Sequence, residues 1–244
     1  MSWHRHDNFP SIIANNLFLE IDHICIYFPD GARGTSVLEE VGIHSPARAI
    51  KRAEQGTVSR LIVFENAYLE LIWIEDENAA KQHAAQTGID MLARSCWRQT
   101  RASPFGISLR RSGTAKPMSD SRQDWDEGMR PEIFINFATD NLACLVEPMC
   151  FLIPDSLALT SWLDCKAHVH QQLLSHPLGT RHLTSVKIAI DSYQELSDAV
   201  SLISRQGEIA IERGSPPLLE LTFDGDVKGK FLDLRPALPI ILNC

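Results

Sequence analysis

The sequence predicts an α+β fold in which two β-α-β-β-β units pair as a curved mixed sheet around a central cleft. Two observations predict it. The order strand, helix and three strands occurs near the N-terminus and again near the C-terminus, and the two occurrences contain the similar strands YLEL (68–71) and FLDL (231–234). A repeated unit of this kind indicates duplication. A sheet that is covered by its own helix on one face needs a partner on the other, which the second unit is expected to supply.

The first unit is expected over residues 20–111, after an N-terminal tail at 1–19. Its opening strand is IDHICIYF (21–28), which Pro29-Asp30-Gly31 ends. GTSVLEEVGI (34–43) is typical of a short helix with Thr35 or Ser36 as its cap and Gly42 at its end. A weak strand near 43–50 and two strands at 57–64 and 67–76 follow, and the short connection Glu65-Asn66 predicts an antiparallel hairpin.

The second unit is expected over residues 182–244. HLTSVKIAI (182–190) opens it, and an amphipathic helix at 192–207 has Ser192 as its cap and Gly207 at its end. Strands are predicted at 208–212, 218–224 and 230–236. The inter-module insert, 112–181, contains a polar segment at 112–131, a candidate lid, and two extra strands at 132–138 and 149–153.

The composition excludes several classes of protein. The chain has 244 residues, a net charge of −8, 44% hydrophobic and 22% charged residues. This is ordinary for a globular protein, and the acidic balance argues against a nucleic-acid partner. No apolar run is long enough to cross a bilayer, the N-terminus lacks the apolar core of a signal peptide, and the six cysteines show no zinc-ribbon spacing. We expect a cytoplasmic monomer or homodimer with reduced thiols, a small-molecule ligand and no membrane partner.

Strand alternation sets which residues face the cleft. In the opening strand, Ile24, Ile26 and Phe28 are expected under the helix, which leaves His23, Cys25 and Tyr27 toward the cleft. Glu70 shares a face with Ile72 and Ile74, so His23 and Glu70 are expected to meet. For His23 three roles remain open: a metal ligand, an acid–base or hydrogen-bonding group, and a core histidine. For Glu70 the structural alternative is an ion pair with Arg60.

Several stretches together resemble the vicinal oxygen chelate superfamily, and more closely its glyoxalase-like branch. They are IDHICI and YLELIWIED, the strand Gly56-Thr57-x-x-Arg60-Leu61, and the segments ASPFGISLR (102–110), EPMCFLIP (147–154), HPLGTRHLTSV (176–186) and FDGDVKGKFLDLRPALP (223–239). The resemblance covers most of residues 20–240. It implies a fold of paired units and a site in the cleft between them.

The resemblance also implies a divalent metal ion, with one ligand from the opening and one from the closing strand of each unit. The matching positions are His23, Glu70, Ser185 and Asp233. Because a serine hydroxyl is a poor ligand, the expected metal set is His23, Glu70 and Asp233, holding Zn, Ni, Mn, Fe or Mg. Ser185, Lys187, Arg60 and Glu220 are the expected substrate-binding positions.

Structural alternatives remain open for these residues. Lys187 is expected to bind an anionic substrate, to neutralise Glu220 or simply to lie at a strand edge, and Glu220 is also a candidate partner of Arg60 across the two units. Asp233 and Arg235 are also read as a local salt-linked turn. His168, His170 and His176 form a loop cluster for which no zinc partners are evident.

Two functions follow from these expectations. The first is a metal-dependent lyase or isomerase acting on a small carbonyl or vicinal-oxygen substrate, with Glu70 or Asp233 moving a proton. The second is a metal-free module that binds or sequesters a small molecule, as drug-resistance members of the superfamily do. A dioxygenase is disfavoured because a second histidine ligand is missing.

Overall fold

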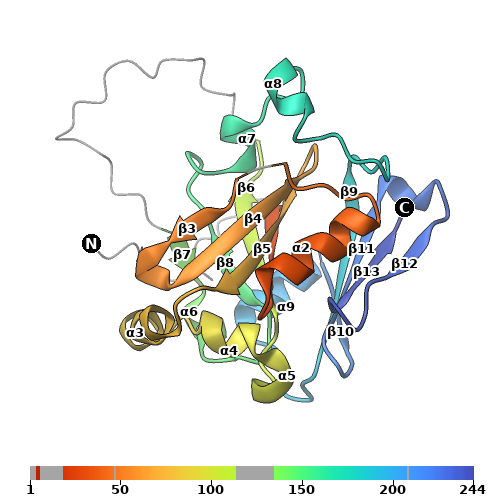
Figure 1. Cartoon of the computed structure of the whole chain (residues 1–244). Coiled ribbons are helices and arrows are strands. Elements are labelled where there is room, and N and C mark those ends of the chain that lie inside the picture. Colours follow the sequence, from red (N-terminus) through yellow and green to blue (C-terminus); the bar gives the residue numbers. More distant parts are fainter. Residues whose placement is uncertain (1–3, 6–18, 47, 114–134, 208) are drawn as a thin grey trace.

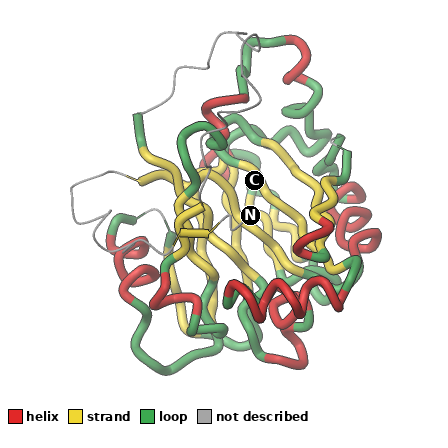
Figure 2. Tube along the Cα trace, turned by 90° about the vertical axis from the view of Figure 1, so that its left-hand side faces the viewer, coloured by secondary structure: helices red, strands yellow, loops and turns green. Residues whose placement is uncertain are grey.

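The computed structural model describes residues 4–5, 19–46, 48–113, 135–207 and 209–244. Most of the predicted tail at 1–19 and of the candidate lid at 112–131 lies outside these residues. The described chain forms an eight-stranded and a five-stranded sheet (Figure 1). In the view turned by 90°, strands run through the middle of the molecule and helices lie around them (Figure 2). The predicted α+β class is confirmed.

The first unit has the predicted order of elements. Its strands are β2 (Leu19–Tyr27), β3 (Ile50–Arg52), β4 (Thr57–Val63) and β5 (Tyr68–Ile74), with helix α2 (Gly31–Glu40) after β2. β2 pairs with β5 in parallel, and β4 pairs antiparallel with both β5 and β3. The predicted hairpin is therefore confirmed.

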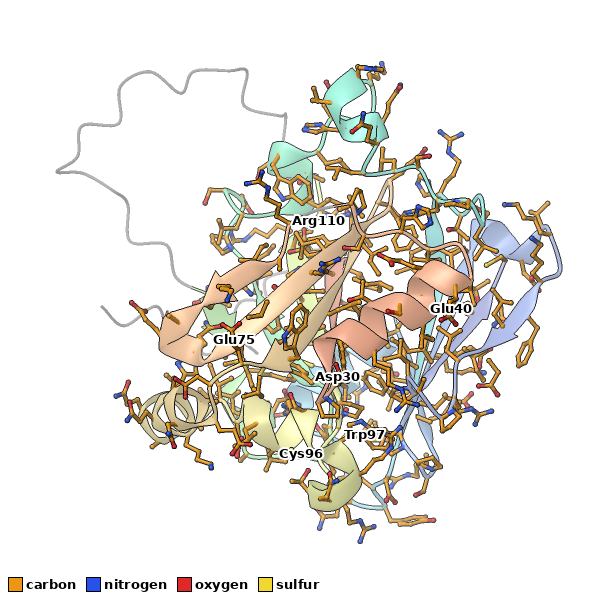
Figure 3. The ribbon with its side chains drawn as sticks, in the orientation of Figure 1. Asp30, Glu40, Glu75, Cys96, Trp97 and Arg110 are labelled. Carbon is orange, nitrogen blue, oxygen red and sulfur yellow. The ribbon has the colours of Figure 1, made fainter. Side chains whose placement is uncertain are left out.

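Helix α2 begins earlier than its predicted cap. Asp30 precedes it, and the Asp30 carboxylate accepts a hydrogen bond from the Arg33 amide at 3.3 Å. Figure 3 shows Asp30 and Glu40 at opposite ends of this helix. Thr35 lies inside the helix, where its hydroxyl donates to the Gly31 carbonyl at 2.9 Å. Gly42 follows the helix with φ of 85°, as its predicted role at the helix end requires.

The second half of the curved sheet comes from the middle of the chain. β6 (Phe105–Arg111) pairs antiparallel with β2, and β8 (Met149–Leu152) lies parallel to β6 and antiparallel to β7 (Ile135–Phe137). This repeats the pairing of β2, β5 and β4. The two predicted extra strands are therefore the partners of the first unit, and the short strand β1 (His4–Arg5) extends the edge.

Residues 182–244 were expected to pair with the first unit around the cleft, but they do not join its sheet. β9 (Leu183–Ile190), β10 (Ala210–Arg213), β11 (Leu218–Phe223), β12 (Phe231–Asp233) and β13 (Ile240–Asn243) form a separate sheet in the order β10-β9-β11-β13-β12. Here the opening strand β9 pairs antiparallel with β11, unlike β2, whose neighbour β5 is parallel. The similar strand 231–234 therefore lies at a sheet edge, while β5 lies inside the other sheet.

One apolar core joins the two sheets. It contains Ile24 and Leu69 from the curved sheet, Leu38 from α2, and Leu219 from the five-stranded sheet. Helix α9 (Asp198–Arg205) contributes to the same core, and its cap is Ser197 rather than the predicted Ser192. Since α2 and the second sheet cover one face of the curved sheet, its other, concave face is left for a site.

The remaining helices surround the ends of the curved sheet. They are α3 (Glu77–Thr87), α4 (Met91–Ser95), α5 (Trp97–Thr100), α6 (Thr139–Leu142), α7 (Leu159–Trp162) and α8 (His168–Gln171). None of the helices in the described ranges is long and apolar enough to cross a membrane.

Candidate metal centre

The predicted alternation of the opening strand is confirmed. Ile24, Ile26 and Phe28 belong to the core beneath α2, whereas His23, Cys25 and Tyr27 line a cavity on the concave face. His23 is paired with Tyr68, and Cys25 with Glu70, across the parallel strands β2 and β5. Directly opposed residues on neighbouring strands share a face. The sheet therefore brings His23, Cys25 and Glu70 together, as predicted for His23 and Glu70.

The cavity has a polar floor and mostly apolar walls. Its volume is about 300 Å³, the lower end of the range of roughly 300–1,000 Å³ for small-molecule sites. The second half of the sheet contributes apolar side chains, and segments beyond the sheet add more. The apolar lining residues from β7, β8, the 153–162 segment and the 89–91 segment are Ile135, Phe137, Met149, Phe151, Ile153, Leu157, Trp162, Ile89 and Met91.

Three potential metal ligands converge on this floor. The nearest atoms of His23, Cys25 and Glu70 lie within 4.8 Å of one another, and all three residues are buried. His23 Nε2 is 3.7 Å from Glu70 Oε2, and Cys25 Sγ is 3.9 Å from the same oxygen. These separations are close to those between ligands that each lie about 2.0–2.3 Å from one zinc ion. The donor set therefore fits a divalent ion, and its thiol favours zinc or iron over magnesium.

Glu70 is held by two neighbours on its other oxygen. The Ser59 hydroxyl donates to Glu70 Oε1 at 2.7 Å, and Arg52 Nη2 lies 2.8 Å from the same atom. Burial alone would raise the pKa of Glu70, but the charge of Arg52 and the hydrogen bond from Ser59 lower it below the ordinary value. Glu70 is therefore ionised at neutral pH, with Oε2 turned toward His23 and Cys25.

Cys25 is a protonated thiol in this environment. Burial, followed by the charge of Glu70, raises its pKa well above the ordinary value. Burial also raises the pKa of Tyr27, which lies two residues further along the same face. A cation bound beside Cys25 would displace its proton, because metal ligands bind as thiolates.

His23 is fixed by contacts on three sides. Its ring stacks on Tyr68 with centroids 4.3 Å apart and meets Phe151 edge-on at 5.6 Å. Its Nδ1 is 2.9 Å from Asp22 Oδ1. Neighbouring residues in a regular strand point to opposite faces, but the pairing of β2 with β6 shifts register between Ile21 and His23, and this irregularity lets Asp22 reach the ring.

The structure does not bring the other predicted site residues to this floor. Ser185, Lys187, Glu220 and Asp233 belong to the five-stranded sheet and do not line the cavity. Across β4 and β5, Arg60 pairs with Leu71, and the next residue, Leu61, pairs with Glu70. Because successive residues of a strand point to opposite faces, Arg60 lies on the face of the sheet away from Glu70. Asp233 therefore does not lie with His23 and Glu70, with which it was expected to form a metal-binding set.

The structural alternatives hold for several of these residues. Lys187 Nζ is 2.9 Å from Glu220 Oε2, so these two neutralise each other. The Arg235 backbone amide donates to Asp233 Oδ1 at 3.0 Å, and the Arg235 guanidinium, which pairs with the same carboxylate, lowers the pKa of Asp233 to about 2. The ion-pair partner of Glu70 is Arg52 rather than Arg60.

The histidine loop serves the fold. His176 Nδ1 accepts from the His44 amide at 3.2 Å, and its Nε2 lies 3.0 Å from the Val63 carbonyl. His170 Nδ1 accepts from the Asp164 amide at 3.0 Å. Within the described residues, the three histidines form no group of metal ligands with other side chains.

Four residues that contribute to the site were not predicted to belong to it: Cys25, Ser59, Arg52 and Asp22. Cys25 was expected to face the cleft, and its position two residues from His23 is the signal that would have suggested a ligand. Ser59 alternates onto the same face from β4. Arg52 comes from a three-residue edge strand and Asp22 from an irregular position in β2. Sequence periodicity gives no signal for the last two.

The comparisons with known proteins agree with this fold. A family model described as a glyoxalase-like domain matches residues 21–202. The chain therefore belongs to the glyoxalase-like domain family, and the predicted resemblance is confirmed. None of the curated proteins matches the sequence.

Solved structures match the chain at low sequence identity. A hypothetical protein from Staphylococcus aureus is 14% identical, with a TM-score of 0.50, over 93% of this chain and 98% of that one. A methylmalonyl-CoA epimerase from Streptomyces coelicolor, in complex with 2-nitronate-propionyl-CoA, is 16% identical with a TM-score of 0.35, over 57% of this chain and 96% of that one. The first of these likenesses shows the fold alone.

Proposed function

We propose that this chain is a metal-dependent lyase or isomerase that acts on a small carbonyl or vicinal-oxygen substrate in the concave cavity. The observation that carries the proposal is the convergence of His23 Nε2, Cys25 Sγ and Glu70 Oε2 on one buried point of the cavity floor. Zinc is the ion that this set of donors suits best.

A bound ion would supply Lewis-acid polarisation of a carbonyl oxygen. The protein's own groups do the remaining work. Arg52 and Ser59 hold one oxygen of Glu70, which leaves Oε2 free of hydrogen bonds to them and directed at the cavity. When the carbon beside the carbonyl bears a hydroxyl, ionised Glu70 takes the C–H proton and the electron pair of that bond moves toward the carbonyl oxygen. The proton then returns at the former carbonyl carbon, and the neighbouring hydroxyl, whose proton passes to the old carbonyl oxygen, becomes the new carbonyl.

The cavity walls select the substrate and exclude water. Phe137, Met149 and Phe151 face the polar floor from the second half of the sheet. An apolar substituent packs against them while the oxygens of the substrate point to His23 and Glu70. The small volume favours a compact substrate.

A second candidate is a metal-free module that binds a small molecule. One observation favours it: Arg52 already compensates the charge of Glu70, so the buried carboxylate is stable without a cation. In this function His23, Cys25 and Tyr68 would serve as hydrogen-bonding and stacking groups for the ligand.

Metal analysis separates the two functions. Protein purified without a chelator is assayed by elemental mass spectrometry before and after loading with zinc, as wild type, as His23→Ala and as the control His168→Ala, which changes an exposed histidine of α8. The enzyme predicts close to one ion per chain, lost in His23→Ala and kept in the control. Absence of bound metal in the wild type after loading would rule out the metal-dependent proposal and leave the binding module.

A further inference from the structure

Asp22 is a fully buried carboxylate directly behind the proposed metal ligand His23. Its two oxygens have separate partners. Oδ1 lies 2.9 Å from His23 Nδ1, and Oδ2 accepts from the Leu159 amide at 2.7 Å. Arg110, labelled in Figure 3, places Nη1 3.5 Å from Oδ2 and is itself buried.

Of the two ring nitrogens of His23, Nδ1 has the shorter contact with a carboxylate, 2.9 Å to Asp22 against 3.7 Å from Nε2 to Glu70. An ionised carboxylate only accepts hydrogen bonds, so the short contact to Nδ1 requires a hydrogen on that nitrogen. Arg110, whose Nη2 donates to Glu20 Oε2 at 2.9 Å, also places its positive charge beside the buried Asp22 carboxylate. A neutral ring with its hydrogen on Nδ1 leaves the lone pair on Nε2, which is the nitrogen that faces Glu70 and Cys25.

We propose that Asp22 is a positioning residue that holds His23 in the Nδ1–H form, so that Nε2 is available to a metal ion. The inference rests on the proposed function in one respect, that the Nε2 lone pair binds a metal ion. The position of the ring hydrogen is testable without metal. A carboxylate behind a ligating histidine commonly orients the ring and raises its basicity.

The Leu159 backbone amide, at the start of α7, makes the effect of the conservative substitution Asp22→Asn predictable. In Asp22→Asn, the Leu159 amide and Arg110 both donate toward the Oδ2 position, so the carbonyl oxygen of the new amide has to occupy it. The amide nitrogen then faces His23 and donates to Nδ1. The proton of His23 moves to Nε2, and the lone pair turns away from Glu70 and Cys25.

Nitrogen-15 NMR of the metal-free protein at neutral pH tests the proposal directly. Long-range proton–nitrogen correlations distinguish the two ring nitrogens, and His23→Gln assigns the signal. The wild type is expected to have the hydrogen on Nδ1 alone, and Asp22→Asn on Nε2 alone. Ser108→Ala is the matched control, since Ser108 pairs with His23 from β6 and its buried hydroxyl has no hydrogen-bond partner.

Zinc affinity, measured by competition with a chromophoric chelator, gives the second readout. We expect Asp22→Asn to bind zinc about 10–100-fold more weakly and Ser108→Ala to bind as the wild type does. A wild-type ring that carries its hydrogen on Nε2, or on both nitrogens, would overturn the assignment even if Asp22→Asn fails to fold. A wild type with the expected ring that binds no zinc would refute the proposed function but not the ring assignment.

Discussion

The Arg52 guanidinium is paired with the Glu70 carboxylate, with 2.8 Å between Nη2 and Oε1. Arg52 comes from the edge strand β3, two strands away from Glu70 in β5. The same guanidinium donates through Nη1 to the Ser59 hydroxyl at 2.9 Å, and that hydroxyl donates to Glu70. Arg52 therefore both neutralises the buried carboxylate and fixes the oxygen that does not face His23.

Arg52→Gln is expected to destabilise the metal-free protein. The substitution removes the positive charge that compensates the buried Glu70 carboxylate. Because about a third of the Arg52 side chain is exposed (35%), we expect the unfolding free energy to fall by about 1–3 kcal/mol, between the values for exposed and fully buried pairs. Urea unfolding at pH 7 measures the loss. Lys51→Gln is the matched control, because it breaks the exposed pair with Glu75 (2.7 Å) and is expected to cost no more than about 1 kcal/mol.

The loss in Arg52→Gln also has a predicted pH dependence. Without the guanidinium, burial raises the pKa of Glu70, so its folded value exceeds that of wild type. The difference in unfolding free energy between the two proteins is largest when the pH is above the folded-state pKa of Glu70 in both proteins. It shrinks as the pH falls, because Glu70 then becomes protonated in both. A difference that stays constant between pH 7 and pH 4 would contradict the role of Glu70.

Zinc binding is expected to release a proton from Cys25. Burial and the neighbouring Glu70 raise the pKa of this thiol, so it is protonated at pH 7 before the ion binds, and the bound form is a thiolate. Calorimetric titrations in buffers of different ionisation enthalpy measure the number of protons released, and the affinity is expected to rise with pH. In Cys25→Ala the release should fall by one proton per ion; an unchanged number would exclude Cys25 as a ligand.

His176 is expected to make the fold less stable in mild acid. Burial lowers its pKa below the ordinary value, and its Nδ1 has to stay unprotonated to accept from the His44 amide. The pKa of His176 is lower in the folded than in the unfolded state. Its contribution to stability is therefore complete above the unfolded-state pKa, near 6.5, and is lost as the pH falls toward the folded-state pKa.

A comparison of variants isolates this contribution. The unfolding free energy of wild type should fall between pH 7 and pH 5 more steeply than that of His176→Gln, by at most about 1.4 kcal/mol per pH unit for one proton. His168→Gln, in exposed helix α8, should keep the wild-type slope. Parallel profiles for wild type and His176→Gln would contradict the assignment.

Local patterns in the sequence predicted local structure well. Alternation in IDHICIYF placed Ile24 and Ile26 in the core and His23 and Cys25 in the cavity. The short Glu65-Asn66 connection predicted the β4–β5 hairpin. Both depend on neighbours along the chain, where side-chain direction follows from strand geometry.

Pairing between distant segments was not predictable in the same way. The true partner strands β7 and β8 have three and four residues, and the first is separated from β6 by the polar segment around 114–134. The C-terminal segment has two longer strands, β9 with eight residues and β11 with six, and a clear helix, and so it was mistaken for the partner. Asp233 was assigned to the site by that error, whereas Arg52 was missed because a long side chain on an edge strand has no periodic signal.

The central claim is that His23, Cys25 and Glu70 bind one metal ion, and X-ray absorption at the zinc edge of the zinc-loaded protein tests it most directly. The account predicts one sulfur at about 2.3 Å with nitrogen and oxygen neighbours at about 2.0–2.2 Å. The sulfur is expected to disappear in Cys25→Ser and to remain in Cys165→Ser, which changes an exposed cysteine. A wild-type spectrum without a sulfur neighbour, or a sulfur that persists in Cys25→Ser, would contradict it.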